Sequence, residues 1–215
     1  MRIFLLGSTG NTGYEILRRL IAENHEIVLL ARNPAKLDPG VPAPGAGMLS
    51  VIQGEVSEPE KLTEHFKGCD VIVSALGTGT SNSVTDIYSG GGRNILNAMR
   101  VNNVKKLITI TSAAVDLSDP STDNFFMNRI IRPSFNKVYY DQTRWETILD
   151  ETTDIDWICV RPPKLLNNQF TGKYRVNLNR CPKGGWKIGR ADLADFIVKQ
   201  LKSNEYVHCK PVIAY

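Results

Sequence analysis

The sequence predicts an α/β protein built on a doubly wound parallel sheet. Short runs rich in β-branched residues alternate with longer stretches of helical periodicity. Runs such as "DVIVSAL" and "KLITITS" hardly alternate between apolar and polar residues, which is typical of strands covered on both faces. Strand–helix alternation of this kind favours right-handed crossovers, which restrict the strand order of the first half to 3-2-1-4 or its flavodoxin-like relative.

The expected strands are Arg2–Leu6, Glu26–Ala31, Leu49–Gln53, Asp70–Ala75, Lys106–Thr111 and Asp156–Arg161, with a late strand at His208–Ala214. The expected helices are Gly13–Glu23, Pro59–Phe66, Thr85–Asn102, Asn136–Asp150 and Ala191–Ser203. The stretch Asp38–Met48 is rich in proline and glycine and predicts a loop between the second and third strands. A length of 215 residues fits a single domain, residues 1–215.

Composition excludes several classes of protein. No apolar run approaches the roughly 20 residues that a membrane helix needs. The start "MRIFLLGSTG" is too short in apolar residues for a signal peptide, so we expect a cytoplasmic protein. The histidines share no ligand spacing with each other or with a cysteine, which predicts no metal site. The cysteines form no C-x-x-C pair and are expected to be buried free thiols: Cys69, Cys159, Cys181 and Cys209.

The glycine-rich turn "GSTGNTG" follows the first expected strand directly and opens a helix. Gly7 ends the strand where the chain must turn tightly, and Gly10 lets the backbone approach a pyrophosphate. Gly13 lets the helix pack closely on the sheet, and the helix N-terminus offers free N–H groups to phosphate. By itself the motif also fits a helix-capping turn without a ligand, but its strand–turn–helix setting favours dinucleotide binding.

Short polar side chains surround these glycines. Ser8, Thr9, Asn11 and Thr12 are suited to capping the helix or to binding phosphate oxygens.

The end of the second strand predicts which dinucleotide binds. An NAD site usually carries an acidic residue there, whereas this chain has Arg32, with Lys36 four residues on. A guanidinium can bind a 2′-phosphate in bidentate fashion. We therefore expect NADP(H) to be preferred over NAD(H). The alternative is a surface Arg–Lys pair at a helix start.

These segments resemble the atypical branch of the short-chain dehydrogenase/reductase superfamily, which has a Rossmann-type fold. Within it, the chain is most similar to biliverdin reductase B-like NADPH-flavin reductases and NmrA-like proteins. The resemblance covers nearly the whole chain and rests on "GSTGNTG", "LLARNPAKL", "VIQGEV", "VIVSALGT", "GGRNILNAM", "VKKLITITSAA", "DWICVRPPKL" and "FTGKYRV".

The resemblance implies a set of cofactor-binding positions. The pyrophosphate would lie on Gly7, Thr9, Gly10, Asn11, Thr12 and Gly13, and the 2′-phosphate on Arg32 and Lys36. Glu55 and Val56 would lie beside the adenine, where the family more often has Asp in place of Glu. Ala75, Leu76, Gly77 and Thr78 would line the cofactor after the fourth strand. Ser112, Pro162, Pro163 and Lys164 would surround the nicotinamide.

The catalytic residues depart from the superfamily pattern of Ser with Tyr-x-x-x-Lys. Ser112 is present, but Tyr140 is followed four residues later by Arg144, and these two are equally well explained as helix neighbours. The flavin-reductase-like proteins do not depend on that pair. Lys164 stands where they often have histidine, and could stabilise an anionic acceptor or donate a proton if burial depresses its pKa.

The family's frequent aromatic residue after Ser-Ala is replaced here by Ala114. A stacking ring would have to come from elsewhere, such as Phe125 or Phe126.

Charge is distributed unevenly along the chain. The stretch Arg161–Arg190, called the basic segment below, holds eight Lys or Arg residues and no Asp or Glu, so that it carries +8 and the rest of the chain −4. It follows the sixth strand, at the edge where ligands bind in this fold. We expect it to attract an anionic substrate, although acidic neighbours in space could also balance it. No nucleic-acid-binding module is present.

The resemblance and the charge pattern place residues of about 113–135 and 161–190 on the substrate side, as a small extension of the domain. Another glycine run, "YSGGGRNIL", falls inside the helix after the fourth strand, where small residues allow close packing rather than a second phosphate loop. No long apolar stripe is expected on the helices, which favours a monomer.

The sequence thus favours an NADPH-dependent reductase of a flavin or similar planar anionic acceptor. The alternatives are an NmrA-like NADP-binding sensor without turnover, and a carbonyl reductase or epimerase using Ser112, Tyr140 and Arg144.

Overall fold

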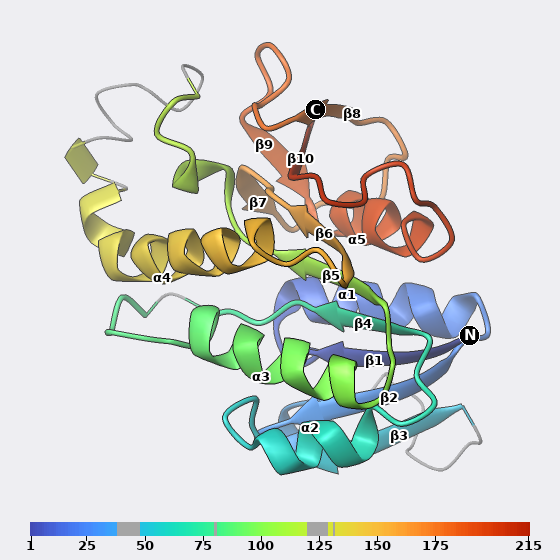
Figure 1. Cartoon of the computed structure of the whole chain (residues 1–215). Helices are drawn as coiled ribbons and strands as arrows, with labels where there is room; N and C mark the ends of the chain where they lie inside the picture. Colours follow the sequence, from blue (N-terminus) through green and yellow to red (C-terminus); the bar gives the residue numbers. More distant parts are fainter. Residues whose placement is uncertain (38–47, 80, 120–128, 131) are drawn as a thin grey trace.

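A six-stranded parallel sheet forms the centre of the protein (Figure 1). The computed structural model describes residues 1–37, 48–79, 81–119, 129–130 and 132–215. The strands of this sheet are β1 (Arg2–Leu6), β2 (Glu26–Ala31), β3 (Leu49–Gln53), β4 (Val71–Ser74), β5 (Lys106–Ile110) and β6 (Asp156–Val160). Their order is β3-β2-β1-β4-β5-β6, so the strand order reverses between β1 and β4. The predicted parallel, doubly wound sheet is confirmed, in the 3-2-1-4 arrangement.

Helices cover both faces of the sheet (Figure 1). They are α1 (Asn11–Ala22), α2 (Pro59–His65), α3 (Ser89–Val101), α4 (Arg132–Asp150) and α5 (Arg190–Lys199), with short 3₁₀ turns η1 (Pro34–Lys36) and η2 (Ala113–Val115). The central strand β1 alternates between the two faces. Ile3 and Leu5 pack with α1 and α5, whereas Phe4 and Leu6 pack with α2, α3 and α4. Burial on both faces explains the continuous apolar runs of the sequence.

Two small sheets follow β6. Strands β7 (Lys164–Leu166) and β9 (Lys187–Gly189) pair in parallel, and β8 (Arg175–Leu178) pairs antiparallel with β10 (Pro211–Ala214). The late expected strand is therefore shorter and begins at Pro211. The segment from Cys209 to Pro211 lies along the free edge of β6. Cys159 N donates to Cys209 O at 3.1 Å, and Arg161 N donates to Pro211 O at 2.9 Å. This contact covers an edge that would otherwise expose unpaired backbone groups.

Helix α4 begins earlier than the sequence pattern predicts. It starts at Arg132, and Pro133 fits this first turn because the first N–H groups of a helix have no partner inside it. A kink follows at Phe135, whose φ and ψ of −128° and 17° are not helical. Most of the predicted loop Asp38–Met48 lies outside the described residues.

No helix of the described residues is long and apolar enough to cross a membrane. The four cysteines, all within the described residues, form no disulfide; Cys69, Cys159 and Cys181 are buried and Cys209 is half-buried.

Candidate functional site

A cavity of about 1580 Å³ lies along the carboxyl edge of the central sheet. Its walls include the ends of the strands and the residues just after them, among them Gly7 after β1, Arg32 after β2 and Ala75 after β4. The cavity therefore spans the point where the strand order reverses, which is where doubly wound sheets bind their ligands.

The glycine turn has its shape for identifiable reasons. Gly7 has a φ of +82°, and a Cβ on it would lie 2.3 Å from the carbonyl oxygen of Ala75. A Cβ on Gly13 would lie 2.1 Å from the carbonyl oxygen of Gly7, so no side chain fits at either position. At Gly10 the nearest protein atom would be an ordinary 3.5 Å away. Packing within the protein thus does not require glycine at position 10. Gly10 lines the cavity, so a side chain there would point into free cavity space.

Helix α1 presents an open N-terminus to this cavity. Its N-cap is Gly10, without a side-chain cap, and its first turn holds no acidic residue. The first N–H groups of a helix have no intrahelical partner, and they attract anions. Thr9, Asn11 and Thr12 line the cavity beside them. Ser8 is buried and is not part of the lining, so its expected contribution to phosphate binding is not supported.

The N-terminus of α3, in contrast, already holds a carboxylate. Asp141 of α4 accepts hydrogen bonds from Tyr88 N at 2.9 Å, from Ser89 N at 3.2 Å and from the Ser89 hydroxyl. The glycines that follow allow close packing. A Cβ on Gly91 would lie 2.8 Å from Val56, and one on Gly92 would lie 2.3 Å from the ring of Trp145 on α4. This run therefore serves helix packing, as the sequence predicts.

The structure brings the predicted cofactor positions together in this one cavity, except Lys164. The lining includes Gly7, Thr9, Gly10, Asn11, Thr12, Gly13, Arg32, Lys36, Glu55, Val56, Ala75, Leu76, Gly77, Thr78, Ser112, Pro162 and Pro163. Because β2 and β3 lie on one side of β1 and β5 and β6 on the other, Arg32 and Ser112 lie toward opposite ends of the cavity.

Basic side chains gather at the β2 end. Arg32 is exposed, and Lys36 lies on η1, whose first turn is capped by Asn33 Oδ1 accepting from Ala35 N at 3.1 Å. Sequence reasoning missed Arg93 of α3, which also lines the cavity. Its only signal was a basic residue directly after the glycine run.

Beside this end, the backbone N–H of Glu55 donates to Glu58 Oε2 at 2.6 Å, and the Glu55 carboxylate accepts from Ser57 Oγ at 3.3 Å. These bonds fix the turn after β3 that carries Glu55 and Val56.

At the other end, Ser112 caps η2. Its Oγ accepts from Ala114 N at 3.2 Å, which leaves the hydroxyl proton available for donation. Ala113 N donates to Pro162 O at 3.0 Å and so ties the turn after β5 to the turn after β6. Arg190 enters the lining from the start of α5, where it donates to Asn167 Oδ1 at 2.6 Å, and burial lowers the pKa of its guanidinium.

The expected Tyr140–Arg144 pair does not reach the cavity. Tyr140 is 69% exposed, Arg144 is exposed, and neither is part of the lining. The adjacent Tyr139 lines the cavity instead, with Phe135, Val138 and Gln142 on the same face of α4. Because Tyr139 and Tyr140 are adjacent, the sequence alone does not show which of the two rings faces the cavity. The helical spacing of Val138 and Gln142, which share a face with Tyr139, was the signal that could have resolved it.

Lys164 also lies outside the lining, because side chains alternate along β7 and its neighbours Pro163 and Leu165 are the ones that face the cavity. Phe125 and Phe126 lie outside the described residues.

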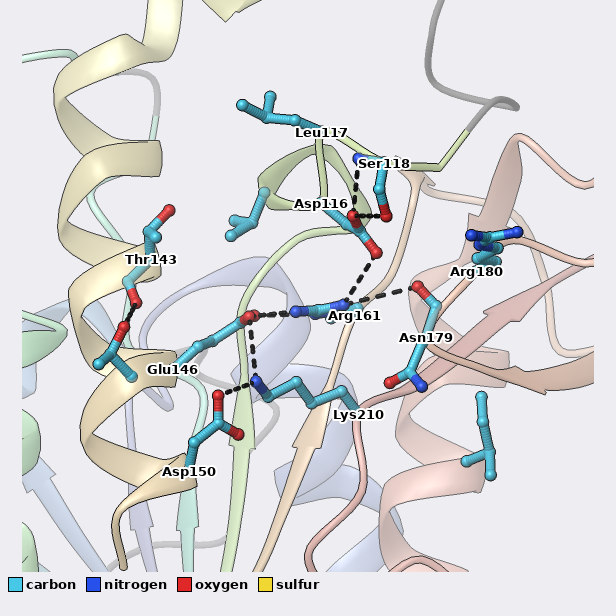
Figure 2. Close-up of a pocket in the computed structure, with 13 residues that line it drawn as sticks. Asp116, Leu117, Ser118, Thr143, Glu146, Asp150, Arg161, Asn179, Arg180 and Lys210 are labelled. Carbon is cyan, nitrogen blue, oxygen red and sulfur yellow. Dashed lines mark hydrogen bonds and ion pairs between the residues drawn. The ribbon is translucent and has the colours of Figure 1, made fainter.

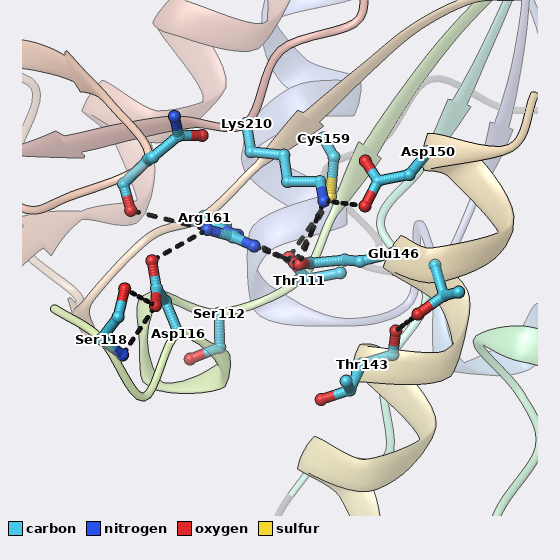
Figure 3. A network of polar contacts seen from close by, with 12 residues as sticks. Thr111, Ser112, Asp116, Ser118, Thr143, Glu146, Asp150, Cys159, Arg161 and Lys210 are labelled. Carbon is cyan, nitrogen blue, oxygen red and sulfur yellow. Dashed lines mark hydrogen bonds and ion pairs between the residues drawn. The ribbon is translucent and has the colours of Figure 1, made fainter. Parts of the chain in front are cut away.

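Behind Ser112 lies a buried network of polar side chains (Figure 3). The guanidinium of Arg161, the residue before Pro162, binds Glu146 of α4 through Nε at 3.0 Å and through Nη2. Thr111, the residue before Ser112, donates to Glu146 Oε1 at 2.7 Å. Glu146 therefore holds the ends of β5 and β6 against α4. The hydrogen bond and charge of Glu146 raise the pKa of Arg161, although burial opposes this.

A second cavity, of about 660 Å³, opens on the other side of this network (Figure 2). Its cations and carboxylates face one another. Arg161 lies 3.5 Å from Asp116 Oδ2, and Lys210 lies 2.7 Å from Asp150 Oδ2. Arg161 and Lys210 are thus paired with carboxylates of the same cavity, whereas the first cavity spans the point where the strand order reverses, so the first cavity is the better candidate for the functional site.

Few cations of the basic segment pair directly with an acid. Within the part of the chain that the structure describes, Arg161 is its only cation in an ion pair with a carboxylate. Arg175 instead donates to the carbonyl oxygens of Lys183, at 2.8 Å, and of Tyr215. Direct pairing with acids is therefore sparse among the described cations of this segment, although Asp192 and Asp119 accept hydrogen bonds from its backbone.

A glycine turn opening onto a bare helix N-terminus, at the reversal point of a doubly wound sheet, defines a dinucleotide-binding protein. Residues 7–204 match the family described as NAD(P)H-binding, and the chain belongs to that family. Binding of NAD(P)H is therefore the property that this chain shares with its family.

Individual relatives are distant. The chain is 24% identical over 206 residues to the uncharacterized sugar epimerase YhfK of Bacillus subtilis, covering 94% of this chain and 88% of the relative. The oxidoreductase ylbE of Lactococcus lactis superposes with a TM-score of 0.81 at 20% identity, covering 100% of this chain and 90% of that one. A short-chain dehydrogenase/reductase of Veillonella parvula in complex with NADP gives 0.80 at 16% identity, covering 100% and 94%. These likenesses confirm the Rossmann-type fold, and they are consistent with the resemblance to atypical short-chain dehydrogenases/reductases.

Proposed function

We propose that this protein is an NADPH-dependent oxidoreductase that transfers hydride to a flavin or a similar planar anionic acceptor. The observation that carries the proposal is the single cavity, which runs from Arg32 and Lys36 to Ser112 and Pro163 along the carboxyl edge of the sheet. The names of its relatives, an oxidoreductase and a short-chain dehydrogenase/reductase bound to NADP, support the same class.

Preference for NADP(H) rests on charge. Arg32 and Lys36 line the cavity at its β2 end, Arg93 of α3 also lines the cavity, and Arg32 occupies the position where NAD-binding sites usually carry an acid. A 2′-phosphate adds negative charge that these side chains can bind, with a bidentate geometry available to each guanidinium.

Bound NADPH would supply the hydride, and the residues of this chain would position it and the acceptor. The N–H groups at the start of α1 hold the pyrophosphate. Ser112, whose Oγ is oriented by Ala114 N, presents its hydroxyl proton to the acceptor. Pro162 and Pro163 offer rigid apolar walls that exclude water from one side of the reacting ring. An acceptor that delocalises the incoming charge needs no dedicated acid, which agrees with the absence of Tyr140 and Arg144 from the lining.

The acceptor is proposed to be anionic because, among the residues that the structure describes, Arg161 is the one cation of the basic segment in an ion pair with an Asp or Glu carboxylate. Uncompensated positive charge beside a cleft raises the local concentration of an anionic substrate.

The experiment is to follow NADPH absorbance with FMN, FAD, biliverdin and a panel of aldehydes and ketones, at matched concentrations. Turnover on flavin or biliverdin, with little on carbonyls, is the expected result. Tight NADPH binding without turnover on any acceptor would contradict the proposal and favour a redox sensor.

A second candidate is a carbonyl reductase or epimerase, favoured by the position of Tyr139 on the same cavity as Ser112 and by the name of the relative YhfK. Tyr139→Phe would then abolish activity on carbonyl substrates, because the phenol is the required proton donor. Tyr140→Phe is the matched control, since that ring is 69% exposed. For the favoured flavin reductase, both variants keep their rate with FMN within about twofold of wild type.

A further inference from the structure

One of the three tryptophans stands apart from the core. Trp145 and Trp157 are 1% and 3% exposed, whereas Trp186 is 57% exposed. Two lysines flank its ring: Lys164 Nζ lies 5.5 Å and Lys187 Nζ 5.1 Å from the centroid. We call these three residues, Lys164, Trp186 and Lys187, the Trp186 patch.

The backbone holds the patch together. Lys164 and Lys187 are register partners on the parallel strands β7 and β9, and Lys164 N donates to Trp186 O at 3.2 Å. The next residues along the two strands, Leu165 and Ile188, pack into the core and anchor the underside of this small sheet. The strand pairing therefore fixes the backbone positions of all three residues.

The two lysines of the Trp186 patch repel each other when no anion is bound. Like charges directly opposite each other on neighbouring strands repel. No carboxylate among the described residues forms an ion pair with either ammonium group. The attraction of each lysine to the exposed ring is weak in water, so both can swing aside at little cost. A bound anion would relieve the repulsion.

The patch also adjoins the cofactor cavity. Pro163 and Leu165, on either side of Lys164 in the chain, line that cavity, and so does Arg190, directly after β9. Both strands that carry the patch thus contribute to the cavity wall as well.

We propose that the Trp186 patch is a rim subsite for the acceptor, which binds there as a planar aromatic ring bearing a phosphate or carboxylate. The Trp186 indole stacks on the ring system, and the two ammonium groups bind the anionic group. This inference rests on the proposed function for naming the occupant as the acceptor. It assigns Lys164 a role in acceptor binding from outside the cavity.

The test measures binding separately from turnover. FMN is titrated into the protein saturated with NADP⁺, and tryptophan emission is followed; riboflavin, which has the same ring without the phosphate, is titrated in parallel. We expect FMN to quench the Trp186 emission, and Trp186→Phe, which retains the two buried tryptophans, to lose that quenching. In Lys164→Gln/Lys187→Gln we expect FMN affinity to fall about fivefold to tenfold and riboflavin affinity to change by less than about twofold. Lys173→Gln removes an exposed lysine of the same basic segment outside the patch, and should match wild type.

Equal quenching in wild type and Trp186→Phe would overturn the inference, as would an unchanged FMN affinity in the double lysine variant. Quenching by a single-stranded oligonucleotide but not by FMN would overturn it too, because the occupant would then be a nucleic acid. FMN binding at the patch without NADPH oxidation would leave this inference standing and contradict the proposed function instead. The two failures are therefore distinguishable.

Discussion

Replacement of Glu146 by glutamine tests how strongly the buried network supports the site. The side chains of Glu146 and Arg161 are 5% and 8% exposed, so water compensates only weakly if either charge is lost. In the wild type, the Arg161 guanidinium donates two hydrogen bonds to the Glu146 carboxylate (Figure 3). Glu146→Gln would place a neutral amide, through its N–H₂ or its oxygen, against the same guanidinium. Breaking a buried pair by removing one partner costs about 3–5 kcal/mol.

The loss should lie near the lower end of that range, about 3 kcal/mol, because Asp116 remains 3.5 Å from Arg161 and supplies some compensating charge. The assay is urea unfolding followed by far-UV circular dichroism. The control is Asp154→Asn, which breaks the Arg100–Asp154 pair, where the side chains are 43% and 48% exposed. Exposed pairs contribute only about 0.2–1 kcal/mol.

A double variant, Arg161→Met with Glu146→Leu, separates charge from packing. Because it removes both charges, its loss of unfolding free energy should be smaller than the sum of the losses of Arg161→Met and Glu146→Leu made singly. A destabilisation of Glu146→Gln no larger than that of Asp154→Asn would refute the claim that this network holds β5, β6 and α4 together.

Further predictions concern the glycine turn and a buried thiol. Gly13→Ala should destabilise the protein by about 1–3 kcal/mol, because its Cβ would lie 2.1 Å from Gly7 O. Gly10→Ala should leave the melting temperature within a few degrees of wild type but weaken NADPH binding at least about tenfold, since its methyl group would enter only the cavity; wild-type affinity in this variant would show that the turn does not hold the pyrophosphate. Burial raises the pKa of Cys69 from 9.0 to about 11, so the thiolate fraction at pH 8 is about 100-fold below that of a free thiol, and maleimide labelling should be correspondingly slow. Because the folded-state pKa is raised, the stability that this proton contributes is present below pH 9 and is lost as the pH rises toward 11, and Cys69→Ala should show a flatter decline of stability in alkali.

The fold was predictable because its signals are local. The strands Arg2–Leu6, Glu26–Ala31 and Leu49–Gln53 have the same bounds in the sequence analysis and in the structure, since apolar runs bounded by Gly, Asn and charged residues define them. The small strands β7, β8 and β9 were missed. Each is three or four residues long, too short for a periodic pattern, and each pairs with a strand distant in the chain.

The site shows the same division. The predicted cofactor positions rest on the glycine turn and on strand ends, which a parallel sheet places at one edge. Residues contributed by helix faces were harder to predict, because a one-residue error in register turns a side chain by about 100°. That error exchanges Tyr139 for Tyr140. The pairing of Arg161 with Glu146 and the exposure of Trp186 depend on contacts between segments, which no local pattern encodes.

The central claim is that this cavity binds NADP(H) through Arg32. Dissociation constants for NADPH and NADH, measured by cofactor fluorescence in wild type and in Arg32→Asp, test it most directly. Losing charge-assisted hydrogen bonds and placing a carboxylate beside the 2′-phosphate should weaken NADPH binding about 10- to 100-fold, while NADH binding stays equal or improves. An unchanged ratio of the two constants would contradict the claim.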